Sequence, residues 1–295
     1  MLARILLASE LGQRLPNIAE LRSQIGVGAG TVQKALQELQ QDGFVTIDSK
    51  QRQGTHILGR HVGALWKTAN LPTLTAVLPL PNSWEFQGLA TGLRAQLDEI
   101  GIPSTFLYGH GSEQRIQALG NGLAQIAVMS LHAARQWVAT EPRVAIDQSF
   151  PSGSYYAPDS VLVIARDPRG SLKSGLRVGI DRLSADHTHL TQREFPTNSY
   201  VDVSYAQLPS ALTRGIIDAA VWHRTALGLS LDDQGLTTWP LGNHGSELID
   251  LELNSAALVR RADDLYTRSV LDQVDSSRVL DLQKGVVAGD LLPVY

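Results

Sequence analysis

Hydroxyl, imidazole, guanidinium and indole side chains recur directly after the strands expected in residues 74–295. In an open α/β sheet, ligands bind beyond the carboxyl ends of the strands, where helix N-termini offer unpaired N–H groups. The candidate ligand-binding residues are therefore Ser83, Trp84, Ser130, His132, Ser184, His187, Thr188, Trp222 and Arg224. The same loops also contain Asn82, Tyr108, His110, Asp186 and His223.

Each of these candidates has a chemical role and a structural alternative. The hydroxyl groups suit an anionic ligand near the positive ends of helix dipoles, and Arg224 can pair with a carboxylate or a phosphate. Trp84 or Trp222 can form the wall of a cleft. A serine at such a position is equally typical of a helix N-cap, and a tryptophan is equally typical of a core. We expect a small-molecule effector, and an anionic group is the part of it that these side chains are best suited to bind.

Several catalytic and metal sites find no support in the sequence. The chain has no cysteine, which excludes disulfides, thiolate metal sites and a cysteine nucleophile. It contains neither the Gly-x-Ser-x-Gly motif of serine hydrolases nor a phosphate-binding P-loop. His187 and His189 lie two residues apart on an expected helix, so they face different sides and make poor joint metal ligands. We expect no catalytic residue, no metal and no cofactor.

A second group of polar side chains lies in the first sixty residues, around an expected third helix. Gln33 can make two hydrogen bonds to adenine, and Lys34 suits a phosphate. Cations at the tip of an expected hairpin suit phosphate or minor-groove contacts. Exposed polar residues on a helix are also typical of a merely solvated face. The candidate DNA-binding residues are Arg14, Thr31, Gln33, Lys34, Lys50 and Arg52.

Three short helices and a hairpin must position these side chains. Asn17, followed three residues later by Glu20, predicts a capping box for a second helix that ends at Gly26. Apolar residues at i, i+3, i+4 and i+7 from Val32 predict the buried face of a third helix, from about 29 to 42. The alternating segment that follows predicts a β-hairpin. Two helices joined by a tight glycine turn and followed by a hairpin predict a winged helix-turn-helix.

The residues of this region resemble the GntR family of bacterial regulators. The resemblance is carried by Arg14-Leu15-Pro16, Gly30-Thr31-Val32, Asp42-Gly43-Phe44 and Gln53-Gly54-Thr55. It implies DNA binding through the third helix. Members of the family often carry Arg just before the Gly-Thr pair and two residues after it, where this chain has Ala29 and Gln33. Fewer cations weaken non-specific DNA binding, so a head retained only for assembly is the alternative.

The rest of the chain alternates expected strands and helices, which predicts α/β architecture with mostly parallel sheets. The stretches 119–128 and 212–221 both contain the end of a helix, a glycine and an Ala/Val-rich strand. This repeat resembles the type 2 periplasmic-binding-protein fold, in which two lobes close on a ligand. We place a linker at 61–73 and a ligand-binding domain at 74–295. Its first lobe covers about 74–164 and 251–295, and its second about 165–250.

The order of these parts resembles the YhfZ family, which has a GntR-like head fused to a binding-protein-like body. Residues 1–60 form the head and carry seven Lys and Arg against five Asp and Glu. The remainder carries eighteen against twenty-four, so a mildly basic head is joined to an acidic body. We find neither a secretory signal nor a run of about 18 apolar residues, and we expect a cytoplasmic protein.

The fold and charge distribution predict a homodimeric transcription regulator that binds DNA and senses a small molecule. Paired half-sites make a homodimer the default arrangement for helix-turn-helix proteins. Two other classes remain as alternatives. A transport-type binding protein would leave the head unexplained. An enzyme on the same two-lobed fold would need an acid/base pair, and none stands out. We therefore expect a protein that is not an enzyme.

Overall fold

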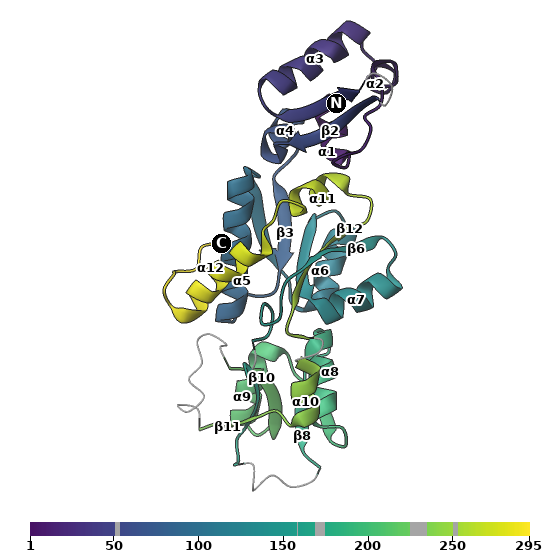
Figure 1. Ribbon diagram of the computed structural model, residues 1–295. Helices are drawn as coiled ribbons and strands as arrows, with labels where there is room; N and C mark the ends of the chain where they lie inside the picture. The colour runs from purple at the N-terminus through teal and green to yellow at the C-terminus, as the bar shows by residue number, and fades with distance from the viewer. Residues whose placement is uncertain (51–53, 158, 169–174, 225–234, 250–252) are drawn as a thin grey trace.

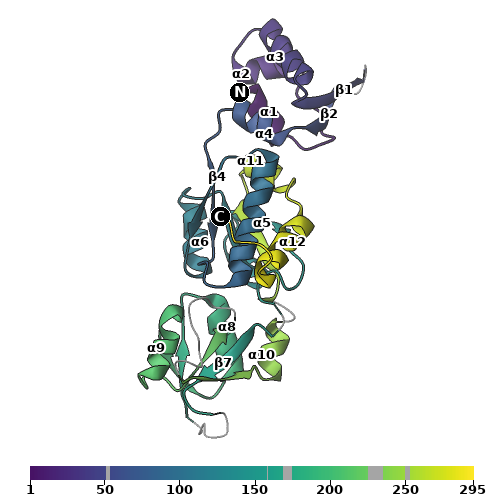
Figure 2. The same cartoon turned by 90° about the vertical axis from the view of Figure 1, so that its left-hand side faces the viewer.

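The computed structural model describes residues 1–50, 54–157, 159–168, 175–224, 235–249 and 253–295. Its three parts follow one another in a line. The N-terminal head lies at one end, a first α/β lobe in the middle and a second lobe at the other end (Figures 1 and 2). The chain ends in the middle lobe. Within the described residues, no helix is long and apolar enough to cross a membrane.

The head is a winged helix-turn-helix, as predicted. Asn17 and Glu20 form both hydrogen bonds of the capping box, at 3.0 and 2.7 Å. Gly26 ends the helix in the left-handed region, with φ at 79°. The elements of the head are α1 (Leu2–Ala8), α2 (Ile18–Ile25), α3 (Ala29–Gln41) and the antiparallel strands β1 (Val45–Lys50) and β2 (Gly54–Arg60).

The segment 61–73, predicted as a linker, contains a packed helix. Helix α4 (Val62–Thr68) buries Val62, Leu65 and Trp66 in a hydrophobic core that runs without a break from the head into the first lobe. The short, nearly uncharged segment has the composition of a connector. Its apolar residues instead lie at helical spacing between two domains, and they are buried from both sides. The head is therefore packed on the first lobe rather than tethered to it.

The first lobe is a five-stranded sheet with helices on both faces. The strand order is β4-β3-β5-β12-β6, with β3, β4 and β5 parallel and β12 antiparallel to its neighbours β5 and β6. Its elements are β3 (Leu74–Leu78), α5 (Trp84–Ile100), β4 (Ser104–Tyr108), α6 (Gly111–Gly120), β5 (Ile126–Ser130), α7 (Leu131–Thr140), β6 (Val144–Ser149), β12 (Ala256–Arg261), α11 (Leu265–Leu271) and α12 (Ser276–Ala288).

The second lobe is also built on a five-stranded sheet. The strand order is β11-β7-β10-β8-β9, with β8, β9 and β10 parallel and β7 and β11 antiparallel. Its elements are β7 (Val161–Ala165), β8 (Arg177–Ile180), α8 (Ala185–Glu194), β9 (Ser199–Asp202), the 3-10 helix η2 (Tyr205–Gln207), α9 (Leu208–Thr213), β10 (Ala219–His223), β11 (Thr237–Pro240) and α10 (Asn243–Leu248).

The crossings between the lobes differ from the predicted boundaries. Residues 161–164 were assigned to the first lobe, but β7 pairs with β10 and β11 in the second sheet. The first crossing therefore precedes Val161. An apolar run such as Val-Leu-Val-Ile predicts a buried strand without indicating which sheet it joins. The second crossing was placed near Leu251, which lies outside the described residues. Leu253 packs in the hydrophobic core of the second lobe, and β12, which begins at Ala256, lies in the sheet of the first lobe. The chain therefore returns to the first lobe between these two residues.

Candidate effector cleft and DNA-contacting surface

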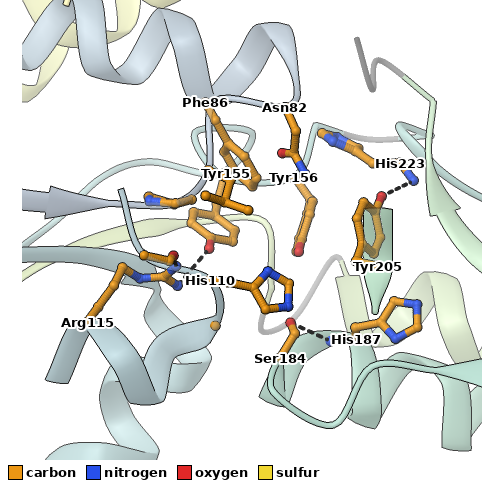
Figure 3. Close-up of a pocket in the computed structure, with 14 residues that line it drawn as sticks. Asn82, Phe86, His110, Arg115, Tyr155, Tyr156, Ser184, His187, Tyr205 and His223 are labelled. Atoms are coloured by element: carbon orange, nitrogen blue, oxygen red, sulfur yellow. Dashed lines mark hydrogen bonds between the residues drawn. The ribbon is translucent and has the colours of Figure 1, made fainter. Parts of the chain in front are cut away.

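A cavity of about 60 Å³ lies between the two lobes. The loops after β3, β4 and β8 and the last residue of β10 converge on it, as the carboxyl ends of strands do in open α/β folds. Figure 3 shows Arg115 and Tyr155 on one side of this space and Tyr205, His187 and His223 on the other. The residues that line it are Pro79, Leu80, Asn82, Phe86, Gly109, His110, Gly111, Arg115, Tyr155, Tyr156, Ser184, His187, Tyr205 and His223.

Arg115, on α6, is the one Lys or Arg among the described residues that line this cavity. It is almost fully buried, with 4% of its surface exposed. Nη1 donates to the Gly109 carbonyl at 2.8 Å, and Nη2 donates to the Tyr155 hydroxyl at 3.4 Å. Nε is buried and has no hydrogen-bond partner. A buried donor without a partner is costly, so the guanidinium has unused capacity to bind an acceptor.

Aromatic rings form much of the cavity wall. Phe86 and Tyr155 have ring centroids 4.8 Å apart, and Tyr155 and Tyr156 are edge-to-face at 5.0 Å. On the opposite side, Tyr205 stacks on Trp222 at 4.6 Å, with the planes 9° apart. The wall therefore offers apolar ring surface to a ligand, beside polar groups such as those of His110, Arg115 and Ser184.

The two lobes also touch each other directly. His110 Nε2 lies 2.7 Å from Asp181 Oδ2, and the Ser130 hydroxyl donates to Asp186 Oδ1 at 2.8 Å. Beside them, His132 Nε2 lies 3.2 Å from His189 Nδ1. In each pair, one residue comes from the first lobe and the other from the second. This is the geometry of a closed cleft.

Burial and neighbouring groups shift the pKa values of two carboxyl groups at this seam, in opposite directions. Burial alone would raise the pKa of Asp181, but His110 and the backbone N–H groups of Tyr205 and Leu183 hold it below its usual value. Burial raises the pKa of Asp186, although the Ser130 hydroxyl and the nearby His132 and Arg115 oppose this.

Two histidines of the cavity are biased toward the neutral form. Burial lowers the pKa of His187 and of His223 below the ordinary 6.5. His187 accepts from the Asp181 N–H through Nδ1, at 3.1 Å, and its Nε2 lies 3.1 Å from the Val221 carbonyl oxygen. These contacts match a neutral ring that carries its proton on Nε2.

The structure brings only two of the predicted ligand-binding residues to the cavity, Ser184 and His187. The hydroxyls of Ser83, Ser130 and Ser184 each accept the N–H of a helix first turn, so all three serines are N-caps. Thr188 donates to the Asp181 carbonyl at 3.1 Å, beside the lobe contacts.

The other predictions lie away from the cavity. His132 contacts His189 at the seam between the lobes. Trp84 is 41% exposed on α5. Trp222 stacks on Tyr205 and is buried in the hydrophobic core of the second lobe. Arg224 is exposed and lines a separate cavity with Asp159. The predicted anion-binding role of Arg224 therefore has no support from the cleft geometry, because the residue at the end of β10 that reaches the cavity is His223.

Five residues that line the cavity were not among the candidates from the sequence, namely Phe86, Arg115, Tyr155, Tyr156 and Tyr205. Phe86 and Arg115 lie within helices, beyond the loops that were searched. The two adjacent tyrosines lie on the segment that crosses between the lobes. Tyr155-Tyr156 after Ser152-Gly153-Ser154 was the available signal, since paired aromatics in a polar, irregular segment are unusual.

On the head, Thr31, Gln33 and Lys34 are exposed at the start of α3. Lys34 also lies 3.8 Å from Glu38, an exposed pair of little energetic consequence. Arg14 is exposed and lies over Gly54 at the base of the wing. Lys50 is the last residue of β1, and Arg52 lies outside the described residues. All three α3 candidates are thus exposed near the start of this helix.

Known proteins resemble both parts of the chain. Residues 62–295 match the family model described as the YhfZ C-terminal domain, and residues 4–57 match bacterial regulatory proteins of the gntR family. The chain is 30% identical over 297 residues to the uncharacterized protein YhfZ of Escherichia coli (strain K12), covering 100% of this chain and 95% of that protein.

Solved structures show the same relationship. The crystal structure of YhfZ from Shigella flexneri aligns with a TM-score of 0.60 and 30% identity, over 79% of this chain and 98% of that one. The periplasmic VFT2 domain of Bordetella pertussis BvgS aligns with a TM-score of 0.51 and 17% identity, over 75% of this chain and 96% of that one. The body therefore has a two-lobed, periplasmic-binding-protein-like fold, joined to a GntR-type DNA-binding domain.

Proposed function

The chain belongs to the YhfZ family, and from this premise we propose that it regulates transcription by closing its interlobe cleft on a small metabolite. The GntR-type head supplies the DNA-binding part and the two-lobed body supplies the sensor. DNA as a partner implies a cytoplasmic location. The cleft releases the metabolite unchanged, so the protein acts as a sensor and not as an enzyme.

The observation that carries the proposal is the continuous core shared by the head and the first lobe. Leu6 of α1, Leu65 of α4 and Val270 of α11 are all fully buried in it. The head and the first lobe therefore move as one body, and only the second lobe is left to move on ligand binding. Cleft closure then changes the position of the second lobe relative to the DNA-binding surface.

A homodimer converts this motion into a change of DNA affinity. If the second lobes contribute to the contact between protomers, closure changes the spacing of the two heads. Paired half-sites on DNA have a set separation, so a change of spacing changes operator affinity. A ligand shifts such an equilibrium only by its difference in affinity for the open and closed forms.

The first test is selection of genomic DNA fragments by the purified protein, at near-physiological salt. The wild type should enrich a short site with two-fold symmetry, and a Thr31→Ala, Gln33→Ala, Lys34→Ala triple variant should not. Lys284→Ala is a matched control, because Lys284 and Lys34 have side chains exposed by 78% and 79%. Equal enrichment by wild type and triple variant would refute DNA reading by α3.

A second test addresses the sensor and the enzyme alternative together. Native mass spectrometry of the purified protein identifies a bound metabolite, which is then incubated with the protein and recovered. A sensor returns it unchanged and alters its DNA affinity on binding, whereas an enzyme returns a product of different mass. Turnover of the metabolite would contradict the proposal.

A further inference from the structure

We propose that the effector is a small monocarboxylate whose carboxylate is bound by Arg115. This inference rests on the proposed function, because it assigns a ligand class to the same interlobe cleft. It also replaces the arginine predicted from the sequence. Arg224 is exposed in a different cavity, whereas Arg115 lines the interlobe cavity and is almost fully buried.

The first step of the argument is the missing counter-charge. Arg115 donates to two neutral oxygens, of Gly109 and Tyr155, and its buried Nε has no partner. Among the described residues, no carboxylate forms an ion pair with it. A buried cation without an anionic partner is strongly destabilising. A bound anion would supply that partner, and a guanidinium pairs especially well with the two oxygens of a carboxylate.

The second step is the charge of the ligand. The three carboxyl groups near the cavity already have partners: Asp181 accepts from three neighbours, Asp186 accepts from Ser130, and Glu85 lies 3.7 Å from His223. Asp186 interacts with Arg115 through space, but burial raises the pKa of Asp186 and so favours its neutral form. One unpaired guanidinium balances a single negative charge, whereas the second charge of a dianion such as phosphate would have no Lys or Arg partner among the described residues that line the cavity.

The third step concerns the body of the ligand. The rings of Phe86, Tyr156 and Tyr205 line the remaining wall, and they offer more apolar surface than an all-oxygen ion such as sulfate can use. The cavity of about 60 Å³ is small. The ligand is therefore a short-chain acid in this closed form.

The test is titration calorimetry on the full-length protein with propionate, lactate, pyruvate and butyrate. Propionamide, phosphate and sulfate are the comparison ligands. The wild type should bind at least one acid, and propionamide and the inorganic anions should bind much more weakly. Arg115→Gln should weaken binding of that acid by about tenfold or more, the loss expected for a charge-assisted hydrogen bond. Arg224→Gln, the same exchange outside the cleft, should bind like the wild type.

The comparison of acid and amide needs no variant, so the proposal stays testable even if Arg115→Gln fails to fold. Failure of all four acids to bind overturns the assignment, as does a phosphate or amide that binds as well as the acids. Unchanged affinity in a folded Arg115→Gln variant also overturns it.

These outcomes differ from a failure of the sensor itself. If a carboxylate binds through Arg115 but leaves DNA affinity unchanged, the carboxylate assignment holds and the proposed regulatory function fails. If a ligand of another class binds the cleft and changes DNA affinity, the regulatory function holds and the carboxylate assignment is wrong.

Discussion

At the scale of single residues, Gln33 and Lys34 are neighbours on the exposed surface of α3 but should act differently on DNA. A lysine contact to phosphate releases a counterion and adds affinity for any sequence. A glutamine that bonds a base edge adds affinity for one sequence only. Ala29 and Gln33 replace cations common in GntR proteins, so Lys34 should carry a large share of the electrostatic contribution.

We therefore predict that Lys34→Ala weakens binding to all DNA sequences. It should also reduce the steepness of a plot of log affinity against log salt concentration, by about 0.9 in slope. Fluorescence anisotropy with a selected site and a scrambled site, across a salt series, measures both effects. Gln33→Ala should weaken binding to the selected site only. A wild-type salt slope in Lys34→Ala would show that Lys34 does not contact phosphate.

The buried His187 predicts a pH dependence of stability. Burial lowers the pKa of His187 in the folded protein below the ordinary 6.5 of the unfolded chain. At a pH between the folded and the unfolded pKa, the unfolded chain binds one more proton than the folded protein. Stability therefore rises with pH through this window and is lost as the pH falls below about 6.5. Asp181, His110 and Tyr205 are the ionisable groups that act on this ring.

Urea unfolding of the wild type at pH 7.5 and at pH 5.5 measures this loss. His187→Gln should be less stable at pH 7.5, because it loses buried hydrogen bonds, but it should lose less stability on acidification. His244→Gln replaces an exposed histidine and is the control. If His187→Gln loses as much stability as the wild type, protonation of His187 is not the cause.

At the scale of elements, the start of α6 lies directly against the loop before α8. Gly111 has a φ of +72°, and a Cβ there would overlap the Leu183 carbonyl oxygen on the other lobe. This position has two separate requirements for glycine. The left-handed backbone disfavours any side chain, and the closed cleft leaves no room for one.

Gly111→Ala should therefore hold the cleft open and weaken effector binding by at least about tenfold, since an open cleft separates the ligand from the second-lobe lining residues Ser184, His187, Tyr205 and His223. Small-angle scattering with and without effector would show no compaction. Gly122→Ala is the matched control, because Gly122 has a φ of +71° and open space around it. Its strain costs about 1–2 kcal/mol of stability, but it should still close. Closure of Gly111→Ala would show that the Leu183 contact is dispensable.

At the scale of the whole molecule, helix α4 packs the head against the first lobe, although the sequence had predicted a linker between them. Gly63 lies so close to the end of α5 that a Cβ would overlap the Ile100 carbonyl oxygen. Arg268 of α11 also pairs with Glu10 of the head at 2.8 Å. The DNA-binding head and the first lobe therefore share one packed interface, and the proposed regulation requires the second lobe to be the part that moves.

Gly63→Ala should force α4 away from α5 and destabilise this junction by about 1–3 kcal/mol, the usual cost of overpacking. Hydrogen exchange should then increase in α1, α4 and α11 together, while the second lobe keeps its protection. Gly120→Ala is the control, because that helical glycine has no neighbour within 4 Å. If exchange increases in the head alone, the head and first lobe are not one cooperative unit.

Much of the architecture could be predicted because its signals are local. The Asn17–Glu20 capping box and Gly26 define α2 by contacts within eight residues, and the apolar spacing from Val32 defines the buried face of α3. The strand–helix alternation predicted the α/β architecture in the same way, whereas the division into two lobes came from the resemblance to the type 2 periplasmic-binding-protein fold. A helical or strand period repeats every few residues, so the sequence by itself determined these elements and the side of α3 that carries the buried Val32 and Leu39.

The cleft depended on contacts that no local pattern contains. Arg115 and Tyr155 are 40 residues apart and meet only because α6 and the crossing segment pack together. The choice of sheet for β7 depended likewise on its partner β10, more than 50 residues later. The tertiary structure alone decided which arginine faces the cavity and whether 61–73 is a tether or a packed helix. Burial and pairing between distant segments result from packing of the whole chain, which the spacing of nearby residues does not specify.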